Sequence, residues 1–336
     1  MKDFAGKLAV VTGGGTGMGR ELCLQLAKAG CNLALCDVSA DNMAETRRLC
    51  LAVDDSLTVS THLCDVASEE QVNAFRDAVL TEHGTDHVHL LFNNAGIGGG
   101  GSFINDEREQ WDKTFDVCWF GVYYCCRAFL PALIAADEAH LVNTSSVNGL
   151  WASLGPDTPH TAYCAAKFAV RGFTEALITD LALNAPHVKV SVVMPGHIGT
   201  QIVANSMAYM GRDPDSLSAE DIDAFRQQLV DAGLPVGNLP DDDIRGLIAQ
   251  QAQAFEAEAP TTAATAAEVI LDGVKHERWR ILIGEDAHVL DAELRAAPEQ
   301  AYDRAFTESL LARGHFASLI QTAGAAVTQT QQAAPS

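Results

Sequence analysis

The chain has 336 residues, of which 48% are hydrophobic, so it can bury a large core and is not disordered throughout. Its formal net charge of −22 argues against nucleic-acid or anionic-membrane partners, because these attract surfaces rich in Lys and Arg. The first residues do not form a secretory signal, and we expect no apolar run of membrane-spanning length. The nine cysteines form no CxxC pair, which favours reduced, mostly buried thiols in a cytoplasmic protein.

Short β-rich runs bounded by turn residues predict strands. They lie, in chain order, at 8–12, 32–36, 57–63, 88–92, 140–144, 188–193 and 280–284. Longer stretches between them have helical periodicity, for example 20–29, 69–80, 110–136 and 162–183. Because strands and helices alternate and the strands are apolar throughout, we expect a doubly wound α/β fold (a Rossmann fold). Its parallel sheet of about seven strands is wrapped by helices.

The stretch 201–260 interrupts this alternation before the last strand. It contains 11 Asp and Glu, 3 Arg and no Lys, with breakers at Pro214, Pro235 and Pro240. We expect two or three amphipathic helices that form an insertion over the carboxyl edge of the sheet. Residues 1–320 are then a single domain with a helical substrate lid at about 201–260, and 321–336 are a flexible tail.

The turn after the first predicted strand reads TGGGTGMG and places Thr12, Gly13, Gly17 and Gly19 in the frame TGxxxGxG. Glycines at such a turn let the backbone approach a pyrophosphate, whose charge meets the N-terminus of the following helix. A glycine-rich turn between a strand and a helix predicts dinucleotide binding.

Asp37 ends the second predicted strand, about twenty residues after the glycines. A carboxylate there accepts hydrogen bonds from both hydroxyls of the adenosine ribose and repels a 2′-phosphate. No Arg or Lys stands beside Asp37 or within the glycine turn in the sequence. NAD is therefore favoured over NADP.

Further motifs follow in a fixed order. They are DV at 65–66, NNAG at 93–96, SSVNG at 145–149, YxxxK at 163–167 and MPGHIGT at 194–200. With the glycine turn, they make the chain similar to the short-chain dehydrogenase/reductase family over roughly 5–200 and again near 262–284. The resemblance implies an NAD site formed by Gly13, Thr16, Gly17, Met18, Gly19, Asp37, Asp65, Val66, Asn94, Ala95, Gly96, Tyr163, Lys167, Pro195, Gly196, Ile198 and Thr200. Within this site, Asp65 and Val66 resemble the pair that contacts adenine in the family.

The resemblance also implies that Ser146, Tyr163 and Lys167 are catalytic. A free tyrosine with a pKa near ~10 is a poor base at neutral pH. We expect Lys167, one helical turn from Tyr163, and the positive nicotinamide ring to lower that pKa. Ser146 donates to the substrate oxygen, and Lys167 also binds the nicotinamide ribose.

One family position departs from the pattern. Cys118 stands where the family usually has the asparagine that holds a water between the lysine and solvent. A thiol is a weak donor and acceptor and cannot reproduce an amide's contacts. The family's proton relay therefore does not carry over directly, whereas NAD binding is unaffected.

Other candidates have competing interpretations. His83, His87 and His89 lack a Cys or carboxylate at metal-ligand spacing, so we expect no metal site. His160 and His197 flank the predicted site and either touch substrate or lie on the surface. The aromatic residues Trp111, Trp119, Tyr123 and Tyr124 favour core or subunit interface over a ligand site.

We therefore predict an NAD-dependent enzyme that interconverts a secondary alcohol and a ketone. The substrate is expected to be alicyclic, aromatic or steroid-like, and to meet a hydrophobic pocket that includes Ile202, Val203, Met207, Tyr209 and Met210. The resemblance implies a homodimer or homotetramer formed by the helices near 110–135 and 162–183. The alternatives are a non-catalytic NAD-sensing protein of the same fold and a sugar-nucleotide epimerase or dehydratase, which the glycine spacing disfavours.

Overall fold

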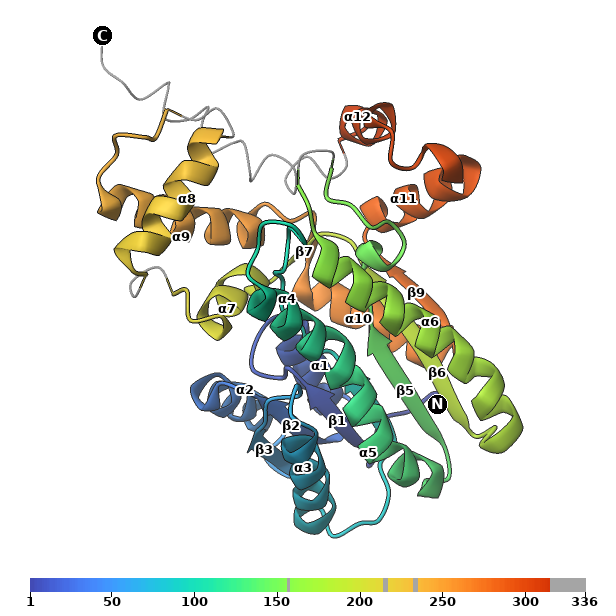
Figure 1. Cartoon of the computed structure of the whole chain (residues 1–336). Coiled ribbons are helices and arrows are strands. Elements are labelled where there is room, and N and C mark those ends of the chain that lie inside the picture. The colour runs from blue at the N-terminus through green and yellow to red at the C-terminus, as the bar shows by residue number, and fades with distance from the viewer. Residues whose placement is uncertain (156–157, 214–216, 232–234, 315–336) are drawn as a thin grey trace.

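A seven-stranded sheet forms the centre of the protein (Figure 1). The computed structural model describes residues 1–155, 158–213, 217–231 and 235–314. The strand order is β3-β2-β1-β4-β5-β6-β9, and every neighbouring pair is parallel. The strands are β1 (Leu8–Thr12), β2 (Asn32–Asp37), β3 (Val59–Leu63), β4 (Leu90–Asn93), β5 (Ala139–Thr144), β6 (Val188–Pro195) and β9 (Arg280–Ile283). The predicted doubly wound α/β fold with seven strands is confirmed.

Helices cover both faces of the sheet. One layer contains α1 (Gly17–Lys28), α2 (Ala40–Val53) and α10 (Ala263–Lys275). The other contains α3 (Glu69–Glu82), α4 (Arg108–Phe115), α5 (Gly121–Ala135) and α6 (Thr161–Asn184). Alternate residues of β1 enter the two cores: Val10 packs toward α3 and α5, whereas Val11 packs toward α1 and α10. Burial on both faces explains why the strands are apolar throughout instead of alternating with polar residues.

The helix predicted at 110–136 is confirmed as one helical run, Arg108–Ala135, with a local change of helix type inside it. A π-helical segment, Asp116–Phe120, separates α4 from α5 and contains the buried Cys118. Together, Arg108–Ala135 are long and apolar enough to cross a membrane, with 56% of the most apolar window buried inside the protein. The prediction that no run reaches this length is therefore wrong. Burial of this kind is also typical of the core helix of a soluble protein.

Aromatic side chains line the outer face of α4 and α5. The ring of Trp111 stacks on Phe115 with centroids 5.2 Å apart, and Trp119 meets Phe173 of α6 edge-on at 5.5 Å. Tyr123 and Tyr124 continue the row, and all four predicted aromatic residues are partly buried. None of these four lines either of the two pockets described below.

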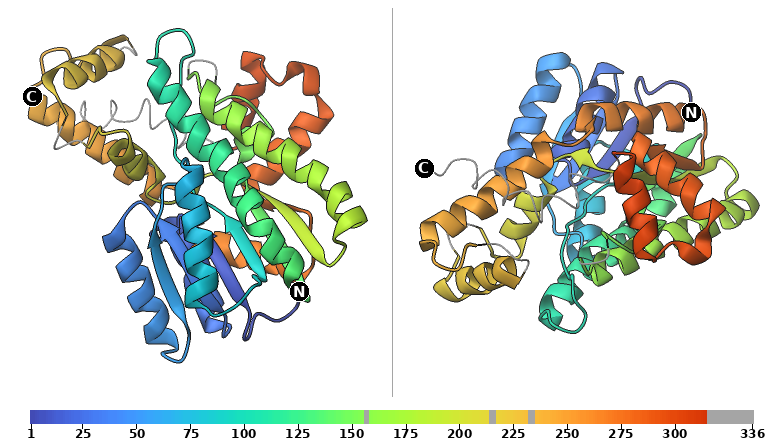
Figure 2. Two further views of the ribbon diagram at one scale, coloured as in Figure 1. Left: turned by 60° about the horizontal axis from the view of Figure 1, so that its bottom comes forward. Right: turned by 90° about the horizontal axis from the view of Figure 1, so that it is seen from above.

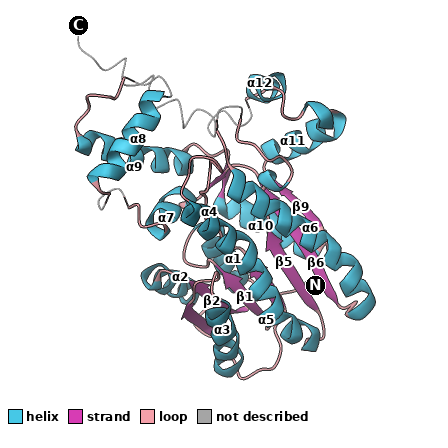
Figure 3. Cartoon of the chain, viewed as in Figure 1, coloured by secondary structure: helices cyan, strands magenta, loops and turns pink. Residues whose placement is uncertain are grey.

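Two groups of helices rise above the carboxyl ends of the strands (Figure 2). The predicted insertion forms α7 (Ile202–Tyr209), α8 (Ala219–Asp231) and α9 (Asp241–Ala257), and α11 (Glu285–Ala296) and α12 (Arg304–Ala312) follow the last strand. A two-residue pairing of β7 (Ile198–Gly199) with β8 (Thr261–Thr262), absent from the sequence analysis, closes the base of the insertion. The separation of these helices from the central sheet is clear in Figure 3. The predicted tail at 321–336 lies outside the described residues.

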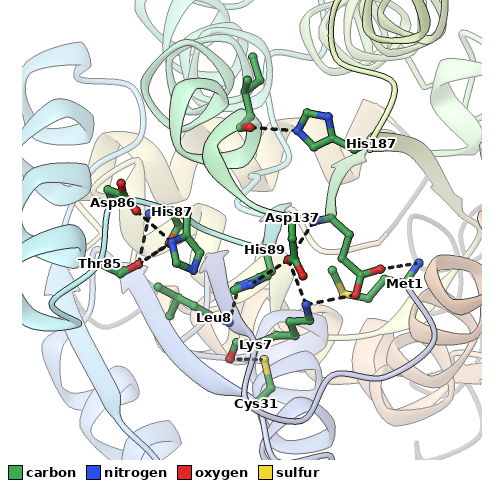
Figure 4. Close-up of polar contacts among 12 residues, drawn as sticks. Met1, Lys7, Leu8, Cys31, Thr85, Asp86, His87, His89, Asp137 and His187 are labelled. Carbon is green, nitrogen blue, oxygen red and sulfur yellow. Dashed lines mark hydrogen bonds and ion pairs between the residues drawn. The ribbon is translucent and has the colours of Figure 1, made fainter.

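The amino edge of the sheet carries ionic contacts far from the glycine turn (Figure 4). Lys7 Nζ lies 3.2 Å from carboxylate oxygens of both Asp137 and Glu138. The amino group of Met1 lies 3.7 Å from a second oxygen of Glu138. Partial burial lowers the pKa of Lys7, but its two carboxylate partners outweigh this effect and leave the pKa raised. These contacts join the first strand to the turn before β5.

The three histidines considered as a metal cluster make separate contacts near this edge. His83 pairs with the hydroxyl of Ser60 (3.0 Å), and His87 pairs with the hydroxyl of Thr85 (3.0 Å). His89 Nδ1 accepts a hydrogen bond from a backbone amide of β1 (3.1 Å). Within the described ranges, no group of three or more His, Cys, Asp and Glu side chains is arranged to hold a metal ion.

His140, fully buried on β5, should make folding sensitive to acid. Ser191 Oγ donates to the carbonyl of Arg278 (2.6 Å), so it accepts from His140 Nε2 (2.7 Å). The buried Nδ1 has no partner among the described residues, so a second proton there would be unsatisfied and the neutral imidazole is favoured. Burial lowers the pKa of His140 to about 3. Because the unfolded chain titrates at about 6.5, the stabilisation is present above that pH and is lost as the pH falls toward 3.

The measurement is the free energy of unfolding from pH 7 to pH 5 in the wild type and in His140→Gln, whose amide can still donate to Ser191. We expect the wild type to lose more stability, by up to about 1.4 kcal/mol per pH unit for one proton. His276→Gln, at an exposed site, is the control and should follow the wild type. Equal pH slopes for wild type and His140→Gln would contradict the assignment.

Candidate active site

Two adjoining pockets open at the carboxyl ends of the strands, where the order of the sheet reverses between β1 and β4. In a doubly wound sheet, ligands bind in the crevice at this point. The first pocket, of about 520 Å³, follows the glycine turn and the ends of β2 and β3. The second, of about 440 Å³, contains the predicted catalytic residues. They share the lining residues Met18, Asn94, Gly96, Thr200 and Ile202, so the two pockets are continuous.

The glycine turn brings backbone to the wall of the first pocket. Gly13 has a φ of +63°, and a Cβ there would lie 2.9 Å from the Cα of Ala95. Gly17 opens α1, whose first-turn amide groups face the same pocket. Gly19 lines neither pocket; a Cβ there would lie 2.0 Å from the carbonyl oxygen of Gly13. Its role is close packing of α1 against the turn.

Thr12 ties the glycine turn to the NNAG motif. Its Oγ1 accepts hydrogen bonds from the backbone amides of Asn94 and Ala95, both at 3.0 Å. The side-chain amide of Asn94 donates to the carbonyl of Thr12 at 3.2 Å. The buried Asn94 Oδ1 has no partner among the described residues. The motif therefore holds β1 and β4 in register and leaves an acceptor at the junction of the pockets.

Asp37 lies at the far end of the first pocket from the catalytic residues. Its carboxylate accepts from the amides of Gly15 (2.9 Å) and Ser39 (3.1 Å). The Arg20 guanidinium is also near Asp37, which the sequence did not predict. It donates a hydrogen bond to the carbonyl of Gly15, the residue whose amide binds Asp37. Arg20 also bonds Thr46 and does not line the pocket. No Lys or Arg is found among the described residues that line the first pocket.

The residues present fit a dinucleotide. The first pocket offers side-chain-free backbone at the glycine turn, a helix N-terminus for a pyrophosphate and an acidic group for ribose hydroxyls. Of the predicted cofactor residues, those lining the first pocket are Gly13, Thr16, Gly17, Met18, Asp37, Asp65, Val66, Asn94, Ala95, Gly96 and Thr200. Tyr163, Lys167, Pro195, Gly196 and Ile198 line the second.

Ser146, Tyr163 and Lys167 meet in the second pocket. Ser146 follows β5, and its hydroxyl accepts a hydrogen bond from the backbone amide of Asn148 at 3.1 Å. Lys167, one turn along α6, is 2% exposed, and its Nζ lies 5.4 Å from the centre of the Tyr163 ring. The ammonium also donates to the carbonyl of Thr144 at 3.0 Å. The predicted pair thus shares one helix face, beside a hydroxyl from the sheet.

The direction of the Tyr163 pKa differs from the sequence expectation. In the chain by itself, burial raises this pKa, and Cys118 raises it further, whereas Ser146 lowers it. Burial also lowers the pKa of Lys167. Desolvation dominates in the chain alone, and the lowering of the Tyr163 pKa by Lys167 stays a prediction for the enzyme with NAD bound.

Cys118 lies beneath this cluster, at the π-helical segment between α4 and α5. Its thiol is buried and donates to the carbonyl of Ile97 at 3.1 Å, where the chain leaves β4. The sulfur would lie 3.8 Å from a Cβ built at Gly96. The thiol therefore anchors the end of the NNAG segment. All nine cysteines are free and buried.

His197 and the unpredicted Asp286 fix the segment that follows β6. The amide of His197 donates to Asp286 Oδ2 at 2.7 Å, and a Cβ at Gly196 would lie 2.2 Å from that carboxylate. The His197 imidazole pairs with the carbonyl of Phe255 on α9 at 2.7 Å. Asp286 is 89 residues from His197 in sequence. Only a glycine at 196 leaves room for the carboxylate. The glycine by itself could not have revealed Asp286 from the sequence, because its role is visible only once Asp286 has been placed in the fold.

The rest of the second pocket is mainly apolar. Ile202, Val203 and Met207 line it as predicted, together with Leu154 and Phe255. The placement of Tyr209 and Met210 in this pocket is wrong. Tyr209 lines the first pocket, and Met210 packs against the core beside Gly99.

His160 borders the second pocket at the start of α6. Its ring packs on Tyr163 with centroids 4.8 Å apart, and burial lowers its pKa to about 4. Among the described residues that line it, Lys167 is the only Lys, Arg, Asp or Glu. The pocket is therefore suited to an uncharged ligand.

Known proteins are similar to this chain in sequence and in fold. Residues 7–210 match the short chain dehydrogenase family. The oxidoreductase SadH of Mycobacterium tuberculosis is 42% identical over 218 residues, 65% of this chain and 76% of SadH. Epidermal retinol dehydrogenase 2 of Mus musculus is 38% identical over 200 residues, 59% of this chain and 62% of its own length.

A solved structure extends the similarity beyond these segments. A short-chain dehydrogenase/reductase from Burkholderia phymatum, in complex with NAD, superposes with a TM-score of 0.69 and 30% identity. The match covers 89% of this chain and 95% of that protein. The family match spans more than half of the chain and includes the glycine turn, the NNAG segment and the Tyr–Lys pair. The chain therefore belongs to the short-chain dehydrogenase family of oxidoreductases.

Proposed function

We propose that the protein is an NAD-dependent dehydrogenase that interconverts a secondary alcohol and a ketone on an uncharged, hydrophobic substrate. The observation that carries this proposal is the cluster of Ser146, Tyr163 and Lys167, which opens into an apolar pocket continuous with the nucleotide-shaped pocket. Alicyclic, aromatic and steroid-like alcohols are the candidate substrates. Epidermal retinol dehydrogenase 2 is named for a hydrophobic alcohol, which supports a hydrophobic substrate here.

Three side chains carry out proton transfer, substrate binding and cofactor binding. Nicotinamide, when bound, exchanges the hydride with the substrate carbon. Tyr163 removes or returns the hydroxyl proton, and Ser146 holds the substrate oxygen through its hydrogen bond. Lys167 supplies positive charge within a helical turn and binds the nicotinamide ribose. Because burial raises the Tyr163 pKa in the chain alone, base catalysis depends on nearby positive charge to lower it, from Lys167 and, when bound, from oxidised nicotinamide.

Purified enzyme should be tested with NAD against a panel of secondary alcohols, with appearance of reduced nicotinamide as the signal. Turnover of at least one hydrophobic alcohol is expected. Tight NAD binding without turnover of any alcohol or ketone would favour the non-catalytic NAD sensor.

Asp37 sets the preference for NAD in this proposal. Asp37→Ala removes the acceptor for the ribose hydroxyls and the charge that repels a 2′-phosphate. A hydrogen bond to a charged group contributes about 1.5–3 kcal/mol, so the ratio of NAD to NADP affinity should fall by roughly 10- to 100-fold. Asp41→Ala, which removes an equal charge from the exposed first turn of α2, should leave the ratio unchanged. A wild type that prefers NADP would contradict this assignment.

The insertion at 201–260 is the proposed substrate lid. Helices α7 and α9 both supply side chains to the second pocket. We expect hydrogen exchange across 201–260 to slow when cofactor and substrate bind together.

The proposed subunit contact is formed by the aromatic side chains of α4 and α5 together with α6. We expect sedimentation to show a dimer or tetramer built on the outer faces of α4, α5 and α6.

A further inference from the structure

Tyr209 joins the insertion to the nucleotide pocket. It ends α7 and lines the first pocket beside Asp65 and Val66. Its hydroxyl donates to Asp65 Oδ2 at 2.8 Å across a separation of 144 residues. The side chain is partly buried against the core. A residue of the proposed lid therefore contacts the carboxylate that follows β3 in the first pocket, whereas Tyr163 lines the second pocket.

Asp65 is held from several directions. Its Oδ1 accepts from the amide of Ala67 at 2.9 Å, and its own amide donates to Gln71 at 3.0 Å. Each carboxylate oxygen has two acceptor sites. One site on each oxygen is occupied by Ala67 or Tyr209, so one remains on each for a ligand in the pocket.

Tyr209 is a donor in this contact at every working pH. Burial is the largest influence and raises its pKa, and the bond to Asp65 raises it further. Asp116, whose own pKa is raised by burial and by neighbouring carboxylates, adds to this effect. The phenol thus keeps its proton and shares it with Asp65.

Two further bonds fix α7 over the pocket. Asn205 Nδ2 donates to Thr16 Oγ1 in the glycine turn at 2.8 Å. Ser206 Oγ accepts from the amide of Gly98 at 2.8 Å. With Tyr209 on Asp65, the helix is tied to both the phosphate side and the base side of the first pocket.

We propose that Tyr209 is a positioning residue for adenine: by binding one side of Asp65, it orients the carboxylate to accept a hydrogen bond from the 6-amino group of the base. This inference rests on the proposed NAD function. It predicts selectivity for adenine over a purine with a 6-oxo group, because that group cannot donate to a carboxylate. The selectivity then depends on a residue of the insertion as well as on the sheet.

The test compares NAD with nicotinamide hypoxanthine dinucleotide, which carries the 6-oxo group, by calorimetric titration of the full chain. The wild type should bind NAD more tightly. Tyr209→Phe should reduce the affinity ratio by about 3- to 10-fold, mainly by weakening NAD, in keeping with the loss of one oriented hydrogen bond. Asp65→Asn should remove most of the preference, and adding Tyr209→Phe to it should have little further effect.

Asn205→Ala is the matched control, since it removes a different α7 bond to the pocket. It should weaken both dinucleotides together and leave their ratio unchanged. An unchanged ratio in Tyr209→Phe, or tighter NAD binding, overturns the inference. A wild type that binds NAD but does not discriminate the base overturns it while the proposed function stands. A wild type that binds neither dinucleotide overturns both.

Discussion

Replacing Tyr163 with phenylalanine is expected to lower the rate of alcohol oxidation by at least ~100-fold while NAD affinity changes little. The substitution keeps the ring that packs against His160 and removes only the phenol hydroxyl. Proton transfer by a positioned side chain contributes roughly 10²- to 10⁴-fold, which sets the size of the loss. Because the ring remains, the fold and the nucleotide pocket should be preserved.

Single-turnover rates with a substrate from the alcohol panel, together with NAD titration, measure the two quantities separately. Tyr123→Phe makes the same chemical change on the aromatic face, outside both pockets, and should retain the wild-type rate. A Tyr163→Phe enzyme with near-normal rate would mean that another group transfers the proton. Equal losses of rate and NAD affinity would indicate a structural role instead.

Gly19→Ala, which adds a single methyl group, is expected to lower the free energy of unfolding substantially. A Cβ at this position would lie 2.0 Å from the carbonyl oxygen of Gly13 and 2.8 Å from Asn94 Nδ2. Backbone cannot yield as a flexible side chain does, so α1 must move away from the glycine turn. Overpacking of this kind typically costs about 1–3 kcal/mol. The shifted turn should also bind NAD at least ~10-fold more weakly, because the cradle and the helix N-terminus move apart.

Denaturant unfolding and NAD titration of the same variant check both effects. Gly246→Ala on α9 is the control, because a Cβ there meets nothing within 4 Å. Alanine is favoured over glycine inside helices by about 1 kcal/mol, so this control should be neutral or slightly stabilising. Wild-type stability and wild-type NAD affinity in Gly19→Ala would show that α1 tolerates the displacement.

The sequence was sufficient for the parts of the site that depend on local spacing. Tyr163 and Lys167 share a helix face because they are four residues apart, and the glycine turn lies between a strand and a helix that are adjacent in the chain. The alternation of apolar strands and helices also determined the parallel sheet, since such strands must be covered on both faces. These features follow from backbone geometry over a few residues.

The tertiary structure decided which distant side chains meet. Asp286 supports the His197 amide, Tyr209 binds Asp65 and Cys118 binds the Ile97 carbonyl. The sequence predicted amphipathic helices within 201–260 but could not specify which pocket each helix would contact, so Tyr209 was assigned to the wrong pocket. It also could not show that burial would raise the Tyr163 pKa. Desolvation and long-range hydrogen bonds depend on how whole elements pack, and that information is absent from residue spacing along the chain.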